Sequence, residues 1–361
     1  MAGSETGALC GSSRSAYAGP QLGAPCGRVV PSARPADVEC SELPFSSGSN
    51  SEMKLYLVLP TFRREEALRR VLVAVGQQTL LPTMTIVVDN ASSLRCAEVV
   101  AQVADDMPQH RVMYVDAGDN TGSAGGTAIG MRVALRQAED DDWIMRCDDD
   151  LLPPAKDFFE VIVAEGRQCL ARDPLAGALG RAGARYDVRR SRLSKPSHDS
   201  GNRFVLVDYL ATGWCPIYRV SAVRDVGVFR SDLFFGLTEV EYGLRMTRRG
   251  YHLYRLDLPE HKRAPASQAK RRLEAPTWRR YYSLRNQIVI HREYFGVRSA
   301  VRVAIVVGVL KPLANIIATP GLALQHLKLN LKAIFHAFRG RLGRTVEPTL
   351  TGGELDRRSG T

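Results

Sequence analysis

Short apolar runs separated by amphipathic segments dominate the chain between residues 53 and 147. Four such runs, each too short for a buried helix and each followed by polar or turn residues, lie at residues 55–59, 85–89, 111–115 and 142–147. Runs of this kind are typical of strands that are buried on both faces of a parallel sheet. We therefore predict four parallel strands in this part of the chain.

The segments between these strands have the periodicity of helices. The first shows i, i+3, i+4, i+7 spacing, with apolar residues at positions 68, 71, 72 and 75. Further helices are predicted at residues 97–104 and 126–137, and a later strand at residues 251–256. This alternation predicts an α/β fold, with a mostly parallel, Rossmann-like sheet and helices on both faces. Such sheets bind their ligands beyond the carboxyl ends of the strands.

The first 52 residues lack this periodicity. Gly, Ser and Pro occupy 22 of these 52 positions, and no apolar segment resembles that of a secretory signal. We predict a disordered leader over residues 1–52, an α/β domain over residues 53–260, and a C-terminal helical region over residues 261–361.

The composition is that of a folded, basic protein. Of its 361 residues, 45% are apolar and 24% are charged, and the net charge is +11 at pH 7. This charge favours anionic partners, such as nucleotide phosphates, acidic lipid head groups or nucleic acid. The seven cysteines form no CxxC pair and are irregularly spaced, which favours free thiols in a reducing compartment and argues against structural zinc.

Three consecutive aspartates, Asp148, Asp149 and Asp150, follow the fourth apolar run. Alternate side chains of an extended segment point the same way, so Asp148 and Asp150 are expected to converge on one ion. Carboxylate oxygens favour Mg²⁺ or Mn²⁺, either of which neutralises a diphosphate leaving group. A solvated acidic turn is the alternative, because residues 139–142 already form an acidic run just upstream.

A glycine-rich stretch at residues 119–130 precedes and opens a predicted helix. Its small residues allow backbone N–H groups to approach an anion or a sugar closely. The stretch matches neither the phosphate-binding GxxxxGK[ST] pattern nor a GxGxxG directly after the first strand, which argues against a dinucleotide-binding oxidoreductase. A plain tight turn is the alternative.

Five segments, taken in order, resemble the inverting family 2 glycosyltransferases. They are Pro60–Arg63, Val88–Ser92, Asn120–Gly130, Asp148–Asp150 and Thr238–Arg245. The resemblance spans about residues 53 to 295 and implies a GT-A fold. It also implies a metal-dependent, inverting transfer of one sugar from a nucleotide-diphosphate donor to a hydroxyl.

Within that family, three segments look most like the bacterial galactofuranosyl- and rhamnosyltransferases that build cell-wall polysaccharides. They are Gly125–Gly126, Glu239–Glu241 and Tyr281–Asn286. This likeness implies a UDP- or dTDP-linked donor of galactofuranose or rhamnose, and a cell-wall or lipid-linked glycan as the acceptor.

The resemblance also assigns donor contacts. The nucleotide-sugar-binding residues are expected to be Thr61, Arg63, Asp89, Asn120, Gly125, Asp149 and Arg285. Asp89 would hydrogen-bond the base, because a carboxylate accepts a ring N–H. Asp149 would lie at the sugar, and Arg285 would meet the diphosphate. For Arg285 the alternative is a helix that simply packs on the sheet.

The remaining roles concern the metal, the base and the acceptor. Asp148, Asp150 and His261 are expected to hold the metal, with a solvent-exposed loop histidine as the alternative for His261. Glu239 aligns with the catalytic base that deprotonates the acceptor hydroxyl, although most relatives have aspartate there. Glu241 would bind the acceptor or orient the base. The alternative for both glutamates is a stabilised helix N-terminus.

One further acceptor contact is assigned to Trp214, as an apolar platform for a sugar ring. A buried core tryptophan is the alternative.

The C-terminal region combines apolar and basic residues. Its apolar run at residues 303–310 stops at a Lys-Pro pair, and a later stripe occupies positions 324, 327, 331, 334, 335 and 338. Five positive charges and no acids lie within residues 325–344. We therefore expect peripheral contact with an anionic membrane, at the inner, cytoplasmic face of the plasma membrane. The alternative is a helix packed on the catalytic domain.

Two other function classes remain open. A sugar-1-phosphate nucleotidyltransferase uses a related sheet and metal, but it has a glycine-rich basic loop after its first strand, unlike Pro60–Arg63. A non-catalytic anionic-ligand binder would explain the net charge. Because the basic residues are not interleaved with an aromatic stripe, we predict no nucleic-acid partner.

Overall fold

The computed structural model describes residues 53–190, 192–194, 203–212, 215–256, 277–314, 316–317 and 319–348. The chain divides into two units, Met1–Pro31 and Ser32–Thr361, and every described residue belongs to the second. The predicted leader and the domain boundary predicted at residue 260 lie outside the described residues, so both stay predictions.

The described part of the chain alternates strands and helices. Its strands are β1 (Leu55–Thr61), β2 (Met84–Asp89), β3 (Val112–Asp116), β4 (Trp143–Arg146), β5 (Ala176–Gly180), β6 (Gly183–Asp187), β7 (Arg192–Ser194), β8 (Phe204–Val207), β9 (Tyr209–Leu210), β10 (Ile217–Arg219) and β11 (His252–Leu256). Its helices are α1 (Glu65–Gly76), α2 (Leu94–Asp106), α3 (Gly122–Leu135), α4 (Phe158–Arg172), α5 (Val220–Val226), α6 (Thr238–Arg248), α7 (Trp278–Phe295), α8 (Val297–Val303), α9 (Lys311–Leu313) and α10 (Pro320–Phe338). Each predicted strand is present, within two residues of its predicted bounds.

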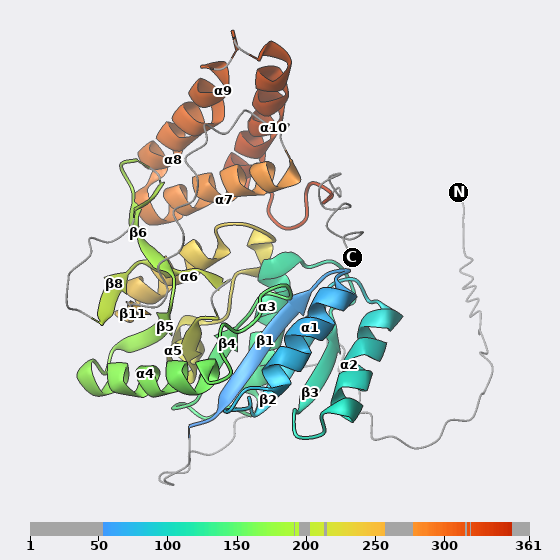
Figure 1. Cartoon of the computed structure of the whole chain (residues 1–361). Coiled ribbons are helices and arrows are strands. Elements are labelled where there is room, and N and C mark those ends of the chain that lie inside the picture. Colours follow the sequence, from blue (N-terminus) through green and yellow to red (C-terminus); the bar gives the residue numbers. More distant parts are fainter. Residues whose placement is uncertain are drawn as a thin grey trace, which may run out of the picture. The chain divides into compact units, whose positions relative to one another are not determined.

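One eight-stranded sheet, in the order β3-β2-β1-β4-β10-β5-β11-β8, organises the α/β part of the chain (Figure 1). Strand β1 pairs in parallel with β2 and β4, β2 with β3, and β5 with β11. Strand β10 runs antiparallel to β4 and β5, and β8 antiparallel to β11. A smaller antiparallel sheet has the order β7-β6-β9. The predicted α/β class with a mostly parallel sheet is confirmed.

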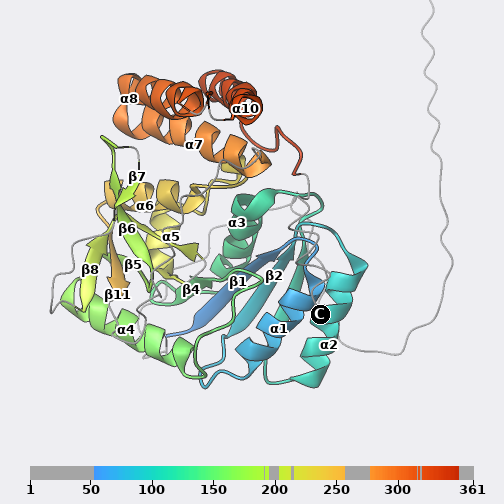
Figure 2. The same ribbon diagram turned by 45° about the horizontal axis from the view of Figure 1, so that its top comes forward.

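The central strand β1 contributes side chains to two hydrophobic cores, because successive side chains point to opposite faces of the sheet. Leu57 and Leu59 face a core shared with α1, α2 and α4, whereas Tyr56 and Val58 face one shared with α3, α5 and α6. Figure 2 shows helices on both faces. Strand β1 is buried along its whole length, which explains why its sequence is a continuous apolar run.

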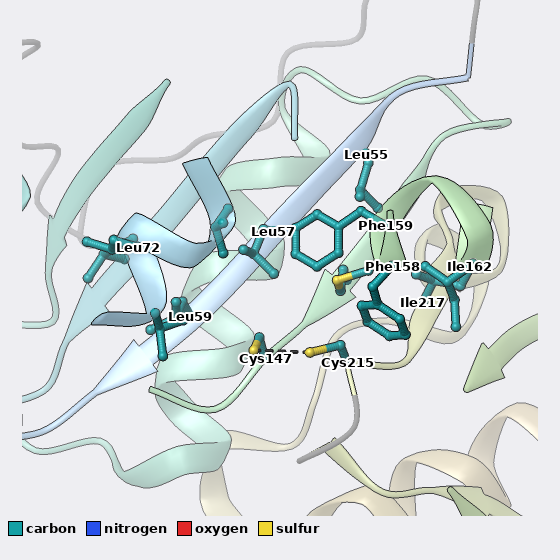
Figure 3. Close-up of a cluster of buried hydrophobic side chains, with 14 of the residues drawn as sticks. Leu55, Leu57, Leu59, Leu72, Cys147, Phe158, Phe159, Ile162, Cys215 and Ile217 are labelled. Atoms are coloured by element: carbon teal, nitrogen blue, oxygen red, sulfur yellow. Dashed lines mark hydrogen bonds between the residues drawn. The ribbon is translucent and has the colours of Figure 1, made fainter. Parts of the chain in front are cut away.

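Figure 3 shows the first of these cores, where side chains of β1 meet those of α1 and α4. The thiols of Cys147 and Cys215 also meet here, with their sulfur atoms 3.1 Å apart. These two residues continue the β4–β10 pairing, because Arg146 N–H donates to the carbonyl of Pro216. Both cysteines are buried and free.

The C-terminal helices have a core of their own. Tyr282 and Ile288 of α7 pack with Val303 of α8 and Ala333 of α10, and Phe234, which precedes α6, joins the same cluster. A π-helix at Ala304–Leu310 connects α8 to α9. The predicted helical region is therefore present. Among the described residues, no helix combines the length and apolar character that crossing a bilayer requires.

Candidate active site

The carboxyl ends of three neighbouring strands bring most of the predicted donor residues to one edge of the sheet. Thr61 at the end of β1 pairs in register with Asp89 at the end of β2. The aspartates Asp148–Asp150 directly follow β4, which lies on the other side of β1. Residues far apart in the sequence thus converge because the strands run in parallel.

Two of the three aspartates share one arginine, Arg64. Asp149 is 7% exposed and accepts hydrogen bonds from Thr61 Oγ1 (2.7 Å) and Arg64 Nη1 (3.2 Å). The exposed Asp150 pairs with the same guanidinium at 2.5 Å. Burial raises the pKa of Asp149, although the charge of Arg64 acts in the opposite direction. Asp149 is therefore hydrogen-bonded to the end of β1, whereas Asp150 is exposed to solvent.

The third aspartate, Asp148, forms an ion pair with Arg146, which is 3% exposed. Arg146 also donates to the hydroxyls of Ser123 (2.9 Å) and Thr127 (3.4 Å) on α3. Burial opposes the charge of Arg146, but the neighbouring Asp148 and the more distant Glu239 outweigh it and raise the pKa of Arg146. The positive charge of Arg146 is thus favoured by both predicted acidic sites, the aspartates after β4 and Glu239.

The donor set suits a hard divalent cation only in part. Asp148 and Asp150 supply carboxylate oxygens with side chains 37% and 54% exposed, so both are accessible to an ion. Each carboxylate is paired with an arginine, and a cation would have to replace that partner. Within the described ranges, no group of three or more His, Cys, Asp or Glu side chains is placed to hold a metal. The predicted third ligand, His261, lies outside those ranges.

Asp89 organises the loop after β2. Its carboxylate accepts the N–H groups of Ala91 (2.8 Å) and Ser93 (2.7 Å) and the hydroxyl of Tyr114 (3.1 Å). The residue is 0% exposed. The predicted contact between Asp89 and a nucleotide base stays a prediction.

The glycine-rich stretch is more helical than its sequence predicts. Helix α3 begins at Gly122 rather than at residue 126, so Gly125 lies in the first turns of the helix and not in a loop. A Cβ at Gly126 would lie 2.8 Å from the side chain of Pro60, so close packing on β1 requires a glycine there. Asn120 does lie in the preceding loop, where its side chain accepts the N–H of Gly122 at 3.0 Å.

The predicted base, Glu239, lies at the start of α6 and is partly exposed. One carboxylate oxygen accepts a bond from Thr238 Oγ1 (3.1 Å), and the other lies 3.5 Å from Thr212 Oγ1. The assignment of Glu239 as the base stays a prediction.

Glu241 does not fit the predicted contact with an acceptor. It is 1% exposed, and it receives bonds from Arg245 Nε (3.1 Å), Arg245 Nη2 (3.2 Å) and the hydroxyl of Tyr294 (2.8 Å). A buried, doubly paired carboxylate stabilises α6 against α7 instead. The predicted acceptor role of Glu241 is therefore corrected to a structural one.

Arg285 is likewise buried and does not face the strand ends. It is 0% exposed, and its guanidinium donates to the carbonyl oxygens of Leu233 (2.8 Å) and Gly343 (2.7 Å). These donors bind backbone carbonyl groups in this structure, and the predicted diphosphate contact of Arg285 stays a prediction. Trp214, the other predicted acceptor contact, lies outside the described residues.

Sequence reasoning selected Arg63 and missed Arg64 and Arg146. Arg63 is exposed and lies over the ring of Phe62, whereas Arg64 binds two of the aspartates. The signal for Arg146 was present, since it is the one charged residue of the apolar run Trp143–Arg146. A buried charge two residues before a carboxylate implies an ion pair.

The fold and the site together define an α/β protein with an acidic centre beyond its parallel strands. Residues 56–226 match the family model described as Glycosyl transferase family 2. The predicted resemblance to the family 2 glycosyltransferases is therefore confirmed for this segment, which makes up slightly less than half of the chain.

Curated relatives are galactofuranosyltransferases of mycobacteria. Galactofuranosyltransferase GlfT1 of Mycolicibacterium smegmatis is 31% identical over 205 residues, which cover 54% of this chain and 65% of the relative. GlfT1 of Mycobacterium tuberculosis is 30% identical over 210 residues, with the same shares covered. The chain thus spans less than two thirds of the length of each of these relatives.

Two solved structures resemble this chain over most of its length at low sequence identity. A mannosyltransferase from Pyrobaculum calidifontis, in complex with GDP-Man and Mn²⁺, has a TM-score of 0.45 at 16% identity, covering 81% of this chain and 88% of that one. Residues 1–349 of S. aureus TarS, in complex with UDP-GlcNAc, have a TM-score of 0.47 at 14% identity, covering 79% and 81%.

Proposed function

We propose that this protein is an inverting glycosyltransferase that moves one sugar from a nucleotide-diphosphate donor to a hydroxyl of a cell-wall or lipid-linked glycan. The observation that carries the proposal is that helix α3 connects two acidic centres. Asp148 pairs with Arg146, which donates to Ser123 of α3. The N–H of Ala124, also on α3, donates to the carbonyl of Phe234 in the turn that precedes Glu239. A leaving diphosphate and an attacking hydroxyl need two such separated sites.

The reaction is a single displacement. The Glu239 carboxylate removes the proton of the acceptor hydroxyl as its oxygen forms a bond to the anomeric carbon. The bond from that carbon to the diphosphate oxygen breaks, and the diphosphate leaves with the electron pair. Attack occurs on the face opposite the leaving group, so the anomeric configuration inverts. No covalent enzyme intermediate forms, and one base is sufficient.

Asp148 and Asp150 are proposed to hold Mn²⁺ or Mg²⁺, together with His261. The ion would supply positive charge at the diphosphate. Arg64 and Arg146 each bind one of these two carboxylates, so the ion would take its place beside two arginines.

The donor is proposed to be UDP-galactofuranose or dTDP-rhamnose. The first is favoured by the name of the curated relatives, galactofuranosyltransferase. Thr61, Arg63, Asp89 and Asn120 would border the nucleotide, because all four lie at or just beyond the carboxyl ends of β1, β2 and β3.

The C-terminal helices are proposed to rest on an anionic membrane surface, which would place the protein at the cytoplasmic face of the plasma membrane. Residues 296–346 contain eight Lys or Arg and no Asp or Glu. On α10, Leu324, Leu331 and Phe335 are each about half exposed. An apolar face flanked only by positive charges is complementary to acidic lipid head groups, and such docking suits a lipid-linked acceptor.

Incubating the purified protein with nucleotide sugars and Mn²⁺ tests the reaction class directly. A glycosyltransferase releases a nucleoside diphosphate. A sugar-1-phosphate nucleotidyltransferase instead exchanges pyrophosphate, and a non-catalytic binder releases neither. Absence of nucleoside diphosphate with every UDP- and dTDP-linked sugar, in the presence of acceptor, would overturn the proposal.

A further inference from the structure

The turn that leads into α6 has an unusual backbone. We call residues 232–237 the base turn, because Glu239 follows it by two residues. Phe234 has φ 60° and ψ −63°, and Leu237 has φ 59° and ψ 15°, although neither is a glycine. Residues other than glycine are strained in this region, and strain persists only where surrounding contacts enforce it.

Helix α7 supplies those contacts through two fully buried polar side chains. The side-chain amide of Asn286 lies within hydrogen-bond distance of the carbonyl oxygens of Leu233 (3.0 Å), Phe235 (2.9 Å) and Gly236 (2.8 Å). Arg285 Nη2 donates to Leu233 as well, and Arg285 Nε donates to Asn286 Oδ1 at 3.0 Å. Three carbonyl groups of the base turn, those of residues 233, 235 and 236, are therefore fixed by one pair of side chains.

Residues 343–346, which we call the tail, bind the same helix and also contact the base turn. Arg285 Nη1 donates to the carbonyl of Gly343, whose own N–H donates to the carbonyl of Asp232 at 2.6 Å. The hydroxyl of Tyr282 donates to the carbonyl of Val346 (2.7 Å) and accepts the N–H groups of Thr345 and Val346 (both 3.1 Å). The tail thus binds the same helix that binds the base turn.

The base turn also contacts the donor side of the site. The N–H of Ala124, in the first turn of α3, donates to the carbonyl of Phe234 at 3.1 Å. Helix α3 in turn carries Ser123 and Thr127, whose hydroxyls accept hydrogen bonds from Arg146. Arg146 also pairs with Asp148. The same strained turn therefore lies between the predicted base and the predicted donor residues.

We propose that Tyr282, Arg285 and Asn286, together with tail residues 343–346, are positioning residues that fix the base turn and thereby hold Glu239 at the reacting hydroxyl. The expected effect on kcat rests on the proposed function. Simple packing does not explain these contacts, because the buried polar groups of α7 bind the backbone of two other segments. Apolar side chains would fill the same space without fixing carbonyl positions.

Two conservative substitutions in the full-length protein test the proposal. Tyr282→Phe keeps the ring that packs against Phe234 and removes the hydroxyl that holds the tail. Asn286→Leu keeps the side-chain volume and removes the amide group that binds the base turn. Tyr186→Phe is the matched control, since it removes a buried tyrosine hydroxyl that binds His291 of the same helix α7 but touches neither the turn nor the tail.

The expected result is a fall in kcat of about tenfold or more for Asn286→Leu and Tyr282→Phe, because small displacements of a reacting group cost rate. The Kd for the donor should stay unchanged, and Tyr186→Phe should keep the kcat of the wild type. A purely structural role would lower Tm and donor affinity together in all three variants. That pattern, or an unchanged kcat in both test variants, overturns the proposal.

Amide hydrogen exchange tests the ordering of the base turn independently of any catalytic activity. Amide protons of residues 234–240 should exchange faster in Asn286→Leu and Tyr282→Phe than in the wild type and in Tyr186→Phe. If the wild type released no nucleoside diphosphate, the reaction class would fail, while exchange would still report whether α7 and the tail order the base turn. Unchanged exchange in both variants would refute that ordering.

Discussion

Arg146 and Asp148 form an ion pair at the end of β4, although they are only two residues apart and one is buried while the other is partly exposed. Arg146 also connects Asp148 to helix α3, because the same guanidinium donates hydrogen bonds to Ser123 and Thr127 of α3. Helix α3 is therefore coupled to the aspartates through one side chain. A ligand that binds Asp148 must compete with this arginine.

The first prediction concerns metal-dependent nucleotide binding. Asp148→Ala and Asp150→Ala should each abolish the increase in Tm that Mn²⁺ and a nucleotide diphosphate together produce, because each removes a carboxylate proposed to bind the ion. Asp141→Ala is the control, since Asp141 is an exposed acid that pairs with Arg219 away from the corner. A full Mn²⁺-dependent shift in both variants would contradict the metal assignment.

The second prediction separates binding from chemistry at Glu239. Glu239→Gln keeps the shape of the side chain and one acceptor oxygen but has no basic carboxylate to accept the proton. Donor affinity should therefore be retained, while kcat should fall by about 10² to 10⁴. Isothermal titration with donor and a turnover assay measure the two effects. Turnover equal to that of the wild type would remove Glu239 as the base.

The third prediction concerns the approach of α3 to the base turn. Gly122 has φ 72°, and a Cβ there would lie 2.2 Å from the carbonyl oxygen of Phe234. Gly118 has φ 73°, but a Cβ there would meet nothing within 4 Å. Gly118→Ala should cost about 1 kcal/mol for backbone strain alone, and Gly122→Ala about 3 kcal/mol or more because overlap is added.

Urea unfolding of the two glycine variants provides the comparison. Equal losses of unfolding free energy would show that the close contact between Gly122 and Phe234 is absent in solution.

The fourth prediction is a pH dependence of stability. Burial lowers the pKa of His110 from 6.5 to about 4, and its ring lies 2.8 Å from the hydroxyl of Thr85. The folded state binds fewer protons than the unfolded state between these pH values. The stabilisation is therefore complete above pH 6.5 and is lost as the pH falls toward 4, by up to about 1.4 kcal/mol per pH unit.

His110→Gln removes this titration. The variant should be less stable than the wild type at pH 7.5, but its unfolding free energy should fall less steeply between pH 6.5 and 4.5. Parallel pH profiles for the two proteins, measured by urea unfolding, would show that His110 is protonated equally in the folded and unfolded states.

The strand and helix order could be predicted because burial imposes a period on the sequence. The apolar run of β1 and the four-position spacing of α1 correspond to buried positions such as Leu57, Leu68 and Val75. The start of α3 could not be predicted, since glycine has low helix propensity. A Cβ at Gly130 would lie 2.4 Å from Val58, so tertiary packing rather than propensity determines this helix.

The roles of individual polar residues were harder to predict than their location. The resemblance placed Asp149 and Thr61 at the strand ends, and they bind each other there. Arg285 and Glu241 were expected to face substrates, but they bind partners inside the protein. Sequence spacing shows that a polar residue lies on a helix. It does not show whether that residue faces solvent or a buried carbonyl group.

The last prediction concerns the apolar face of α10, which the described structure leaves uncovered at Leu331 (50% exposed) and Phe335 (49% exposed). The double variant Leu331→Ser/Phe335→Ser should bind vesicles containing phosphatidylglycerol at least about tenfold more weakly than the wild type, because partial burial of each side chain contributes on the order of 1 kcal/mol. The control Leu94→Ser/Leu175→Ser changes two leucines elsewhere that are at least as exposed (84% and 52%) and should bind as the wild type does. The basic charge of this region predicts that neutral phosphatidylcholine vesicles bind weakly in every case. Equal binding of both double variants to the acidic vesicles would contradict the membrane-facing assignment of α10.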